Sequence, residues 1–264
     1  MFHGCVGAID GFFQKTNAPN GTNVANVISY YSGHYESYGL NCQAACDARL
    51  KVLFFGIVAP GSTNDNIAFH MAEALAETIS KLPTGLYMLG DAAYTLSEHL
   101  LIPFTGSQRD NADNDAFNYH LSQLRIRIEM AFGRLVNKFR ILKKNLEGKT
   151  MKINARIIMA CAILHNFIID QDVPEDEKGD DHDDIDVDNL GIIPMVGSPL
   201  GMVYHPTIIE DDFEELEGFS QTRLALVDFI RTSMIRRPAH NIQRNSGRII
   251  GATRVIEPEF FHPA

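Results

Sequence analysis

Short hydrophobic runs alternate with stretches of helical periodicity over the first two-thirds of the chain. Apolar runs of strand length predict strands at residues 5–10, 40–47, 51–58, 86–90 and 100–104. Apolar positions three to four residues apart predict helices at residues 66–82, 121–142, 153–169 and 222–235. Strands that come first and then alternate with helices predict an α/β fold, in which helices flank a mixed sheet.

Polar breaks divide this pattern into units. A turn at residues 47–49 predicts that the second and third strands form a hairpin, and the polar residues 106–115 predict a loop ahead of the long helix. We expect one domain with a sizeable core over residues 1–169, an acidic disordered linker at 170–189, and a partly helical, arginine-rich tail at 190–264.

The charge is distributed unevenly along the chain. The formal net charge is −10, and residues 170–188 alone hold 11 acids and one lysine. Residues 125–156 instead hold 10 Lys and Arg against two acids, a net +8. A basic face of that density favours a polyanionic partner such as DNA, although an ordinary solvated helix surface has the same pattern.

Three carboxylates stand where a metal site could form. Asp10 and Asp91 each follow a hydrophobic run, and Glu129 lies inside the basic helix. The carboxyl ends of neighbouring parallel strands meet at one edge of a sheet, and carboxylate oxygens are what Mg²⁺ or Mn²⁺ prefers. Taken singly, each aspartate could be a turn residue, Glu129 could pair with Arg125 one turn away, and Asp65 could be a helix N-cap.

Other catalytic signatures are absent from the sequence. It holds no G-x-S-x-G motif, no G-x-G-x-x-G motif and no Walker motif, which disfavours serine hydrolases and NTP-driven enzymes. His165 lies in an apolar helix, where a packed and hydrogen-bonded histidine is the simplest interpretation. The four cysteines follow no disulfide or zinc spacing, so we expect reduced, buried thiols. No uninterrupted apolar run is long enough for a membrane span.

Eight short blocks follow one another between residue 4 and about residue 170. They are VGAIDG (6–11), LNCQAACDA (40–48), PGSTND (60–65), LGDAAY (89–94), FN (117–118), RIRIEMAFGR (125–134), KFRIL (138–142) and CAILHN (161–166). In order and spacing this series resembles the DDE-type transposases and transposase-derived nucleases of the PIF/Harbinger class.

The resemblance implies an RNase H-like fold and a two-metal nuclease site using Mg²⁺ or Mn²⁺. It places the acidic triad on Asp10, Asp91 and Glu129, and a further metal-site carboxylate on Asp65. We expect Asp10 to bridge both ions. Basic side chains expected to grip DNA phosphates are Arg125, Arg134, Lys138, Arg140, Lys143 and Lys144. A nuclear location also follows from the resemblance alone.

The chain departs from the family pattern at two places near the expected site. The family usually continues from the first aspartate with a Thr/Val-His type sequence, whereas this chain has Phe12-Phe13-Gln14. The family's basic Arg/Lys-Lys-Gly stretch is replaced by residues 32–37, SGHYES. We expect both changes to alter substrate contacts and to leave the carboxylates intact.

Several functions stay open on this basis. The sequence favours metal-dependent endonuclease or transposase-like hydrolysis of DNA, with strand transfer undecided. Because the chain begins close to the first catalytic strand, we expect the family's upstream DNA-binding region to be missing, and a separate protein could then supply target recognition. The alternative is a catalytically inactive, transposon-derived DNA-binding or adaptor protein. A nuclease for RNA–DNA hybrids is a third option.

Overall fold

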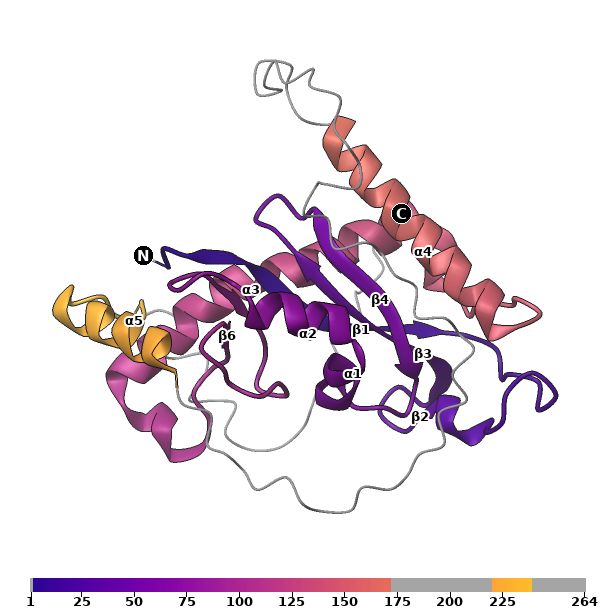
Figure 1. Ribbon diagram of the computed structural model, residues 1–264, viewed down its shortest axis with the longest axis horizontal. Helices are drawn as coiled ribbons and strands as arrows, with labels where there is room; N and C mark the ends of the chain where they lie inside the picture. Colours follow the sequence, from indigo (N-terminus) through magenta and orange to yellow (C-terminus); the bar gives the residue numbers. More distant parts are fainter. Residues whose placement is uncertain (1, 172–219, 239–264) are drawn as a thin grey trace, which may run out of the picture.

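A mixed β-sheet crosses the middle of the molecule and carries helices on both faces (Figure 1). The computed structural model describes residues 2–171 and 220–238. In sheet order, the main strands are β4 (Val52–Pro60), β3 (Ser37–Cys46), β1 (Cys5–Lys15), β5 (Tyr87–Leu89) and β6 (Leu100–Leu101). β1 runs antiparallel to β3 and parallel to β5, and β6 is parallel to β5. The predicted α/β class is therefore confirmed.

The hairpin of β3 and β4 lies where the sequence predicts it, and β3 also pairs with the short β2 (Tyr31–Ser32). β1 is longer than predicted. It continues to Lys15, so that Asp10 lies in the middle of the strand and the expectation of a strand end at Asp10 is wrong. The reason is that β3 offers partners along the whole length, from Ala8↔Cys46 to Lys15↔Gly39, and aromatic residues suit a paired strand.

The helices differ from the prediction mainly at their ends. The single helix expected at 66–82 is two helices, α1 (Asp65–Met71) and α2 (Glu73–Ser80), because Ala72 leaves the helical conformation with ψ at 57°. The long helix α3 (Ala112–Lys138) begins nine residues earlier than expected, since the Asn111 side chain caps it by accepting bonds from Asp113 and Asn114.

The expected loop at 106–115 is therefore replaced by a short 3-10 helix, η2 (Gly106–Asp110), and the first turn of α3. A second 3-10 helix, η3 (Arg140–Lys143), follows α3. The remaining helices are α4 (Met151–Gln171) and α5 (Gln221–Thr232). A further 3-10 turn, η1 (Ile28–Tyr30), precedes β2.

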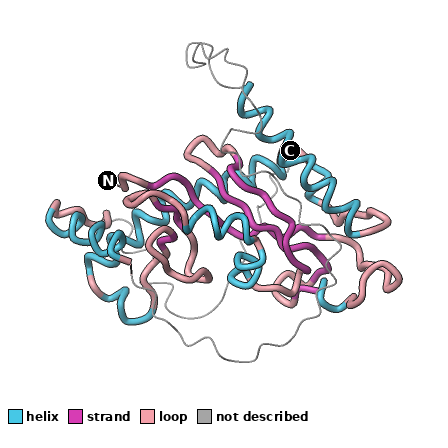
Figure 2. The backbone as a smooth tube through the Cα atoms, in the orientation of Figure 1, coloured by secondary structure: helices cyan, strands magenta, loops and turns pink. Residues whose placement is uncertain are grey.

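Alternating residues of β1 contribute to two hydrophobic cores, one on each face of the sheet. Ala8 packs with residues of α3 and α4, whereas Ile9 packs with residues of α1 and α2. The tube view shows helices in front of and behind the strands (Figure 2). Because side chains alternate along a strand, Asp10 belongs to the α3 face and Gly11 to the α1 face.

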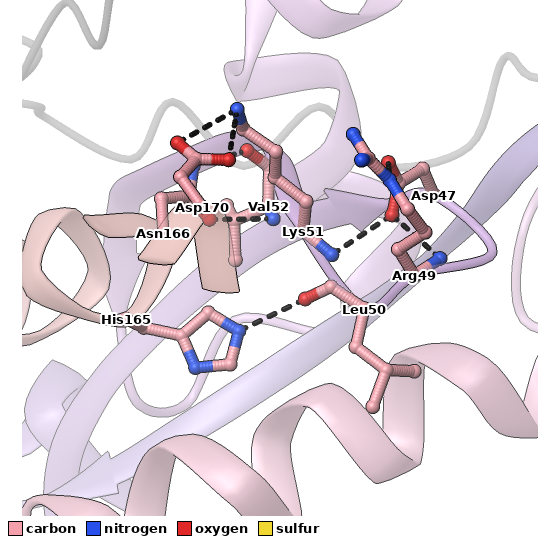
Figure 3. Close-up of polar contacts among 8 residues, drawn as sticks. All are labelled: Asp47, Arg49, Leu50, Lys51, Val52, His165, Asn166 and Asp170. Carbon is pink, nitrogen blue, oxygen red and sulfur yellow. Dashed lines mark hydrogen bonds and ion pairs between the residues drawn. The ribbon is translucent and has the colours of Figure 1, made fainter. Parts of the chain in front are cut away.

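Polar bonds fasten α4 to the turn between β3 and β4 (Figure 3). His165 Nε2 lies 2.9 Å from the carbonyl oxygen of Leu50, and Asn166 bonds both the N–H and the carbonyl of Val52, at 2.8 and 2.7 Å. Lys51 pairs with Asp170 at 2.7 Å. His165 is 2% exposed, which agrees with its interpretation as a packed, hydrogen-bonded histidine.

By length and composition, α4 could also cross a membrane, and it is the one helix of the described residues with that property. Core helices of soluble proteins share it, and α4 contributes several buried side chains, such as Ile158 and Ala162, to the core beside the sheet. The finding is thus weak evidence for a membrane.

The helix α5 packs against α3 (Figure 1). Glu98 accepts bonds from the N–H groups of Gln221 and Thr222 at the start of α5. The Arg223 guanidinium lies 4.0 Å from the centre of the Phe104 ring. The part of the tail that includes α5 thus belongs to the same packed body as the sheet. The expected acidic linker, apart from Asp170 and Gln171 at the end of α4, lies outside the described residues.

Candidate functional site

Asp10 and Glu129 share one guanidinium. Arg125 Nη1 lies 2.8 Å from Asp10 Oδ2, and its Nη2 lies 2.5 Å from Glu129 Oε1. The side chains of Asp10 and Arg125 are 18% and 21% exposed, whereas that of Glu129 is 50% exposed. The helical pair of Arg125 and Glu129 considered from the sequence therefore exists, but it also reaches the middle strand of the sheet.

The surroundings of Asp10 disfavour its charged form. Burial, with smaller contributions from the nearby charges of Asp91 and Asp65, raises the pKa of the Asp10 carboxyl to about 6. Arg125 and the Gly11 N–H, which donates to Oδ1 at 2.9 Å, act in the opposite direction. Since burial outweighs the guanidinium, an additional cation near Asp10 would be favoured.

Asp91 follows the end of β5 as the sequence predicts, two residues after Leu89. Its Oδ1 accepts the Ala93 N–H at 2.8 Å, which closes a local turn and fixes one carboxylate oxygen. β5 is parallel to β1, and Leu89 lies opposite Ala8. Asp91, two residues after Leu89, therefore lies next to Asp10, two residues after Ala8. The electrostatic influence of Asp91 on Asp10 agrees with this placement.

Asp65 lies on the opposite face of β1 from Asp10. Asn64, rather than Asp65, is the N-cap of α1, and its side chain accepts the Ile67 N–H at 2.8 Å. The Asp65 carboxylate lies directly over Gly11, where an added methyl group would come within 2.2 Å of Oδ1. A side chain at position 11 would displace the Asp65 carboxylate, so the glycine permits this approach.

A buried polar network supports Asp65 from the sheet. Asn41 donates to Asp65 Oδ1 at 3.1 Å, and Gln43 lies 3.5 Å from the same atom. Tyr94 in turn donates its hydroxyl to Gln43 Oε1 at 2.9 Å. Sequence reasoning missed these three residues. The available signal was a pair of polar residues, two positions apart, inside an otherwise apolar strand.

The four predicted carboxylates do not form one ready-made metal cluster. Within residues 2–171 and 220–238, no group of three or more His, Cys, Asp or Glu side chains is close enough to hold a metal ion. The hard carboxylate donors suit Mg²⁺ or Mn²⁺, but Arg125 holds Asp10 and Glu129, and Asp65 lies over Gly11 on the other face of β1, near enough for its charge to act on Asp10. The carboxylate donors fit a divalent metal, but the Arg125 guanidinium lies between Asp10 and Glu129, where such an ion would bind.

The predicted DNA-binding residues divide into two kinds. Arg125 is engaged by two carboxylates. The remaining five are exposed on the second half of α3 and on the residues just after it: Arg134, Lys138, Arg140, Lys143 and Lys144. These side chains provide a basic surface at the end of the helix that carries Glu129 and on the residues just after it.

A cavity of about 450 Å³ lies elsewhere along α3. It is lined by the start of β1, by Cys46 and Asp47 at the end of β3, and by α3 residues from His120 to Arg127. None of the four predicted carboxylates lines it, so the candidate chemistry is located outside this cavity.

Comparisons with known proteins match the part of the chain that contains the four predicted carboxylates. The model of the DDE superfamily endonuclease family matches residues 9–166, more than half of the chain. HARBI1 of Xenopus laevis, which is named as a nuclease, is 26% identical over 176 residues, covering 64% of this chain and 48% of that protein. The protein ALP1-like of Arabidopsis thaliana is 29% identical over 192 residues, covering 67% of this chain and 45% of that protein.

The chain thus spans about half the length of the curated relatives it matches. No solved structure matches it significantly. The family model begins just before Asp10 and ends at Asn166, which bonds α4 to β4, so the matched segment contains the predicted triad and the sheet that carries it. On the strength of that match, the chain belongs to the DDE superfamily endonuclease family, as its resemblance to PIF/Harbinger transposases predicts.

Proposed function

We propose that this protein is a divalent-metal-dependent DNA endonuclease of the transposase type, with Asp10, Asp91 and Glu129 as its catalytic carboxylates. The observation that carries the proposal is the convergence of Asp10, from the middle strand, and Glu129, from α3, on a single cation, the Arg125 guanidinium. The strand order, with β1 between antiparallel β3 and parallel β5, supports an RNase H-like arrangement of the domain.

The chemistry requires a concentrated negative charge next to a phosphodiester. Asp10, Asp91 and Glu129 would hold Mg²⁺ or Mn²⁺, and a bound ion of this kind activates water and stabilises the leaving oxygen. The pKa of Asp10 is raised chiefly by burial, so a cation bound beside it would stabilise its charged form. The exposed basic side chains that follow Glu129, such as Lys138 and Lys143, would bind the DNA backbone.

Asp65 has a different part in this proposal. It stands at the start of α1, lies over Gly11 of β1 and is held by Asn41, so we assign it to the support of the site. Target recognition by a separate DNA-binding protein and a nuclear location remain part of the proposal, on the basis of family membership.

A plasmid-nicking assay with Mg²⁺, Mn²⁺ or EDTA tests the proposal. Asp10→Asn, Asp91→Asn and Glu129→Gln should each abolish metal-dependent nicking, a loss on the order of 10³-fold or more, because the charge stabilisation of the transition state is removed. Glu73→Gln, on an exposed position of α2, is the matched control and should nick as the unmodified protein does. Full nicking by any of the first three variants would remove that residue from the mechanism.

A specific observation favours the second candidate, a catalytically inactive DNA-binding or adaptor protein. Arg125 pairs with both Asp10 and Glu129 within the protein itself, and the described residues hold no ready metal cluster. Calorimetric titration with Mn²⁺ separates the two candidates. Binding that disappears in Asp10→Asn supports the endonuclease, whereas DNA binding without any carboxylate-dependent uptake of Mn²⁺ supports the adaptor.

A further inference from the structure

A fixed aromatic pair lies on the same face of β1 as Asp65. Phe13 follows Gly11 by two residues, so both face α1. Its ring is held between two glycines: a methyl group added at Gly39 or at Gly61 would come within 2.4 or 2.7 Å of the ring carbons. Side chains at either position would push the ring out, so the backbone itself forms the slot that holds Phe13.

Tyr35 stacks on the Phe13 ring. The two rings are nearly parallel, at 8°, with their centres 4.3 Å apart. Tyr35 belongs to the turn between β2 and β3, where Glu36 has a positive φ of 48°, and His34 meets the Tyr35 ring edge-on at 4.7 Å. Tyr35 is nevertheless 46% exposed. The Phe13 ring thus holds the exposed Tyr35 ring in one orientation.

The pair adjoins the candidate site. Gly11, which lies under the Asp65 carboxylate, is two residues from Phe13, and Asp10 is three residues away on the same strand. Burial raises the pKa of the Tyr35 phenol, and the charges of Asp65 and Asp10 raise it further, so the ring is close enough to feel both acids. The phenol therefore stays neutral beside them.

The composition of this turn determines what it can bind. Residues 32–37 contain no Lys or Arg, where the family pattern has a basic stretch, so the turn offers little charge for a phosphate. It offers an aromatic face instead. Nucleobases stack on such faces irrespective of sequence, and a base can do so only when it is unpaired or displaced from the duplex.

We propose that Tyr35, supported by Phe13, is a nucleobase-stacking platform at the edge of the site, and that the protein prefers DNA with an unpaired nucleotide there. This inference rests on the proposed action on DNA. Phe13 and Tyr35 belong to the two segments that depart from the family pattern, so the inference gives these departures one common role in substrate choice.

The test is a binding measurement in EDTA, so that no cleavage is involved. The probes are a duplex with 2-aminopurine in a single-nucleotide bulge and the same duplex fully paired. Tyr35→Ala should weaken binding of the bulged duplex on the order of 10- to 100-fold and abolish the stacking-induced loss of 2-aminopurine fluorescence, with a much smaller effect on the paired duplex. Tyr35→Phe should retain both properties, because stacking needs only the ring.

Two further variants make the outcome decisive. Tyr31→Ala removes another exposed tyrosine, on β2, and should bind both duplexes as the unmodified protein does. Tyr35→Leu keeps an apolar contact with Phe13 but offers no aromatic face, so it should behave like Tyr35→Ala even when its melting temperature is unchanged. Unaltered binding of the bulged duplex by Tyr35→Leu or Tyr35→Ala would overturn the proposal.

Failure of the inference can be distinguished from failure of the proposed endonuclease function. Metal-dependent nicking together with unaltered binding by Tyr35→Ala would remove the platform alone. Tyr35-dependent binding without any nicking would remove the endonuclease and keep the platform. Absence of DNA binding by the unmodified protein would remove both.

Discussion

At the scale of single residues, the sequence predicts candidate carboxylates and not what surrounds them. Asp10, Asp91 and Glu129 can be picked out because each stands at a recognisable position in a hydrophobic or helical pattern. The contact between Arg125 and Asp10 joins residues 115 positions apart, and no local periodicity encodes it. The contact of Asp65 with Gly11 is likewise not encoded locally. The absence of a side chain at Gly11 matters only because α1 brings Asp65 close to it.

Arg125 is expected to compete with a metal ion for Asp10 and Glu129. Replacing it in Arg125→Met leaves Asp10 part-buried without its charged partner, which should lower the free energy of unfolding by about 1–3 kcal/mol in the absence of metal. Mn²⁺ should then raise the melting temperature more in Arg125→Met than in the unmodified protein, because no guanidinium has to be displaced.

Thermal denaturation with and without Mn²⁺ measures both effects. Arg127→Met removes an exposed guanidinium two residues away on α3 and is the matched control, expected to leave the Mn²⁺ response unchanged. An equal Mn²⁺ response of Arg125→Met and the unmodified protein would show that Arg125 and the metal do not compete.

At the scale of elements, strand and helix positions follow from periodicity, whereas their ends follow from neighbours. β1 extends past Asp10 because β3 pairs with it as far as Gly39, and α3 starts early because Asn111 caps it. Neither cause lies within the run of residues that predicts the element. The end of α4 is similar, since Asp170, expected in the linker, belongs to the helix and pairs with Lys51.

The burial of His165 of α4 beside the β3–β4 turn should make stability depend on pH. Burial lowers the pKa of His165, so the folded protein favours the neutral ring. A depressed pKa contributes stability above the unfolded value of about 6.5, and this contribution is lost as the pH falls below it. The free energy of unfolding should therefore decrease on acidification.

His165→Gln retains an N–H donor for the Leu50 carbonyl but cannot become charged, so its stability should fall less steeply over the same pH range. Urea unfolding at a series of pH values gives the two slopes. The exposed His70 of α1 provides the control, since His70→Gln should leave the slope as it is. Equal slopes for His165→Gln and the unmodified protein would mean that His165 is not responsible.

At the scale of the whole molecule, the mixed sheet and its flanking helices could be predicted from the order of the elements. The distribution of side chains between the two faces could not, because it depends on the register of each strand. A shift of one residue in β1 would exchange Asp10 for Gly11 on the α3 face, and the register is fixed by pairing with β3 and β5. The position of Asp65 over Gly11, rather than over Asp10, is a consequence of that register.

Charge is also organised at this scale, since the basic residues gather on α3, η3 and the start of α4 while most of the acidic excess lies elsewhere in the chain.

If the basic surface binds phosphates, replacing exposed Lys143 and Lys144 by alanine should weaken DNA binding to the same extent whatever the DNA sequence. The plot of log K against log salt should become shallower by about 0.9 for each phosphate that the variant no longer neutralises. Fluorescence anisotropy in EDTA at several salt concentrations gives this slope. Lys81→Ala, just after α2, should leave it unchanged, and an unaltered slope in the Lys143 and Lys144 variant would place the DNA on another surface.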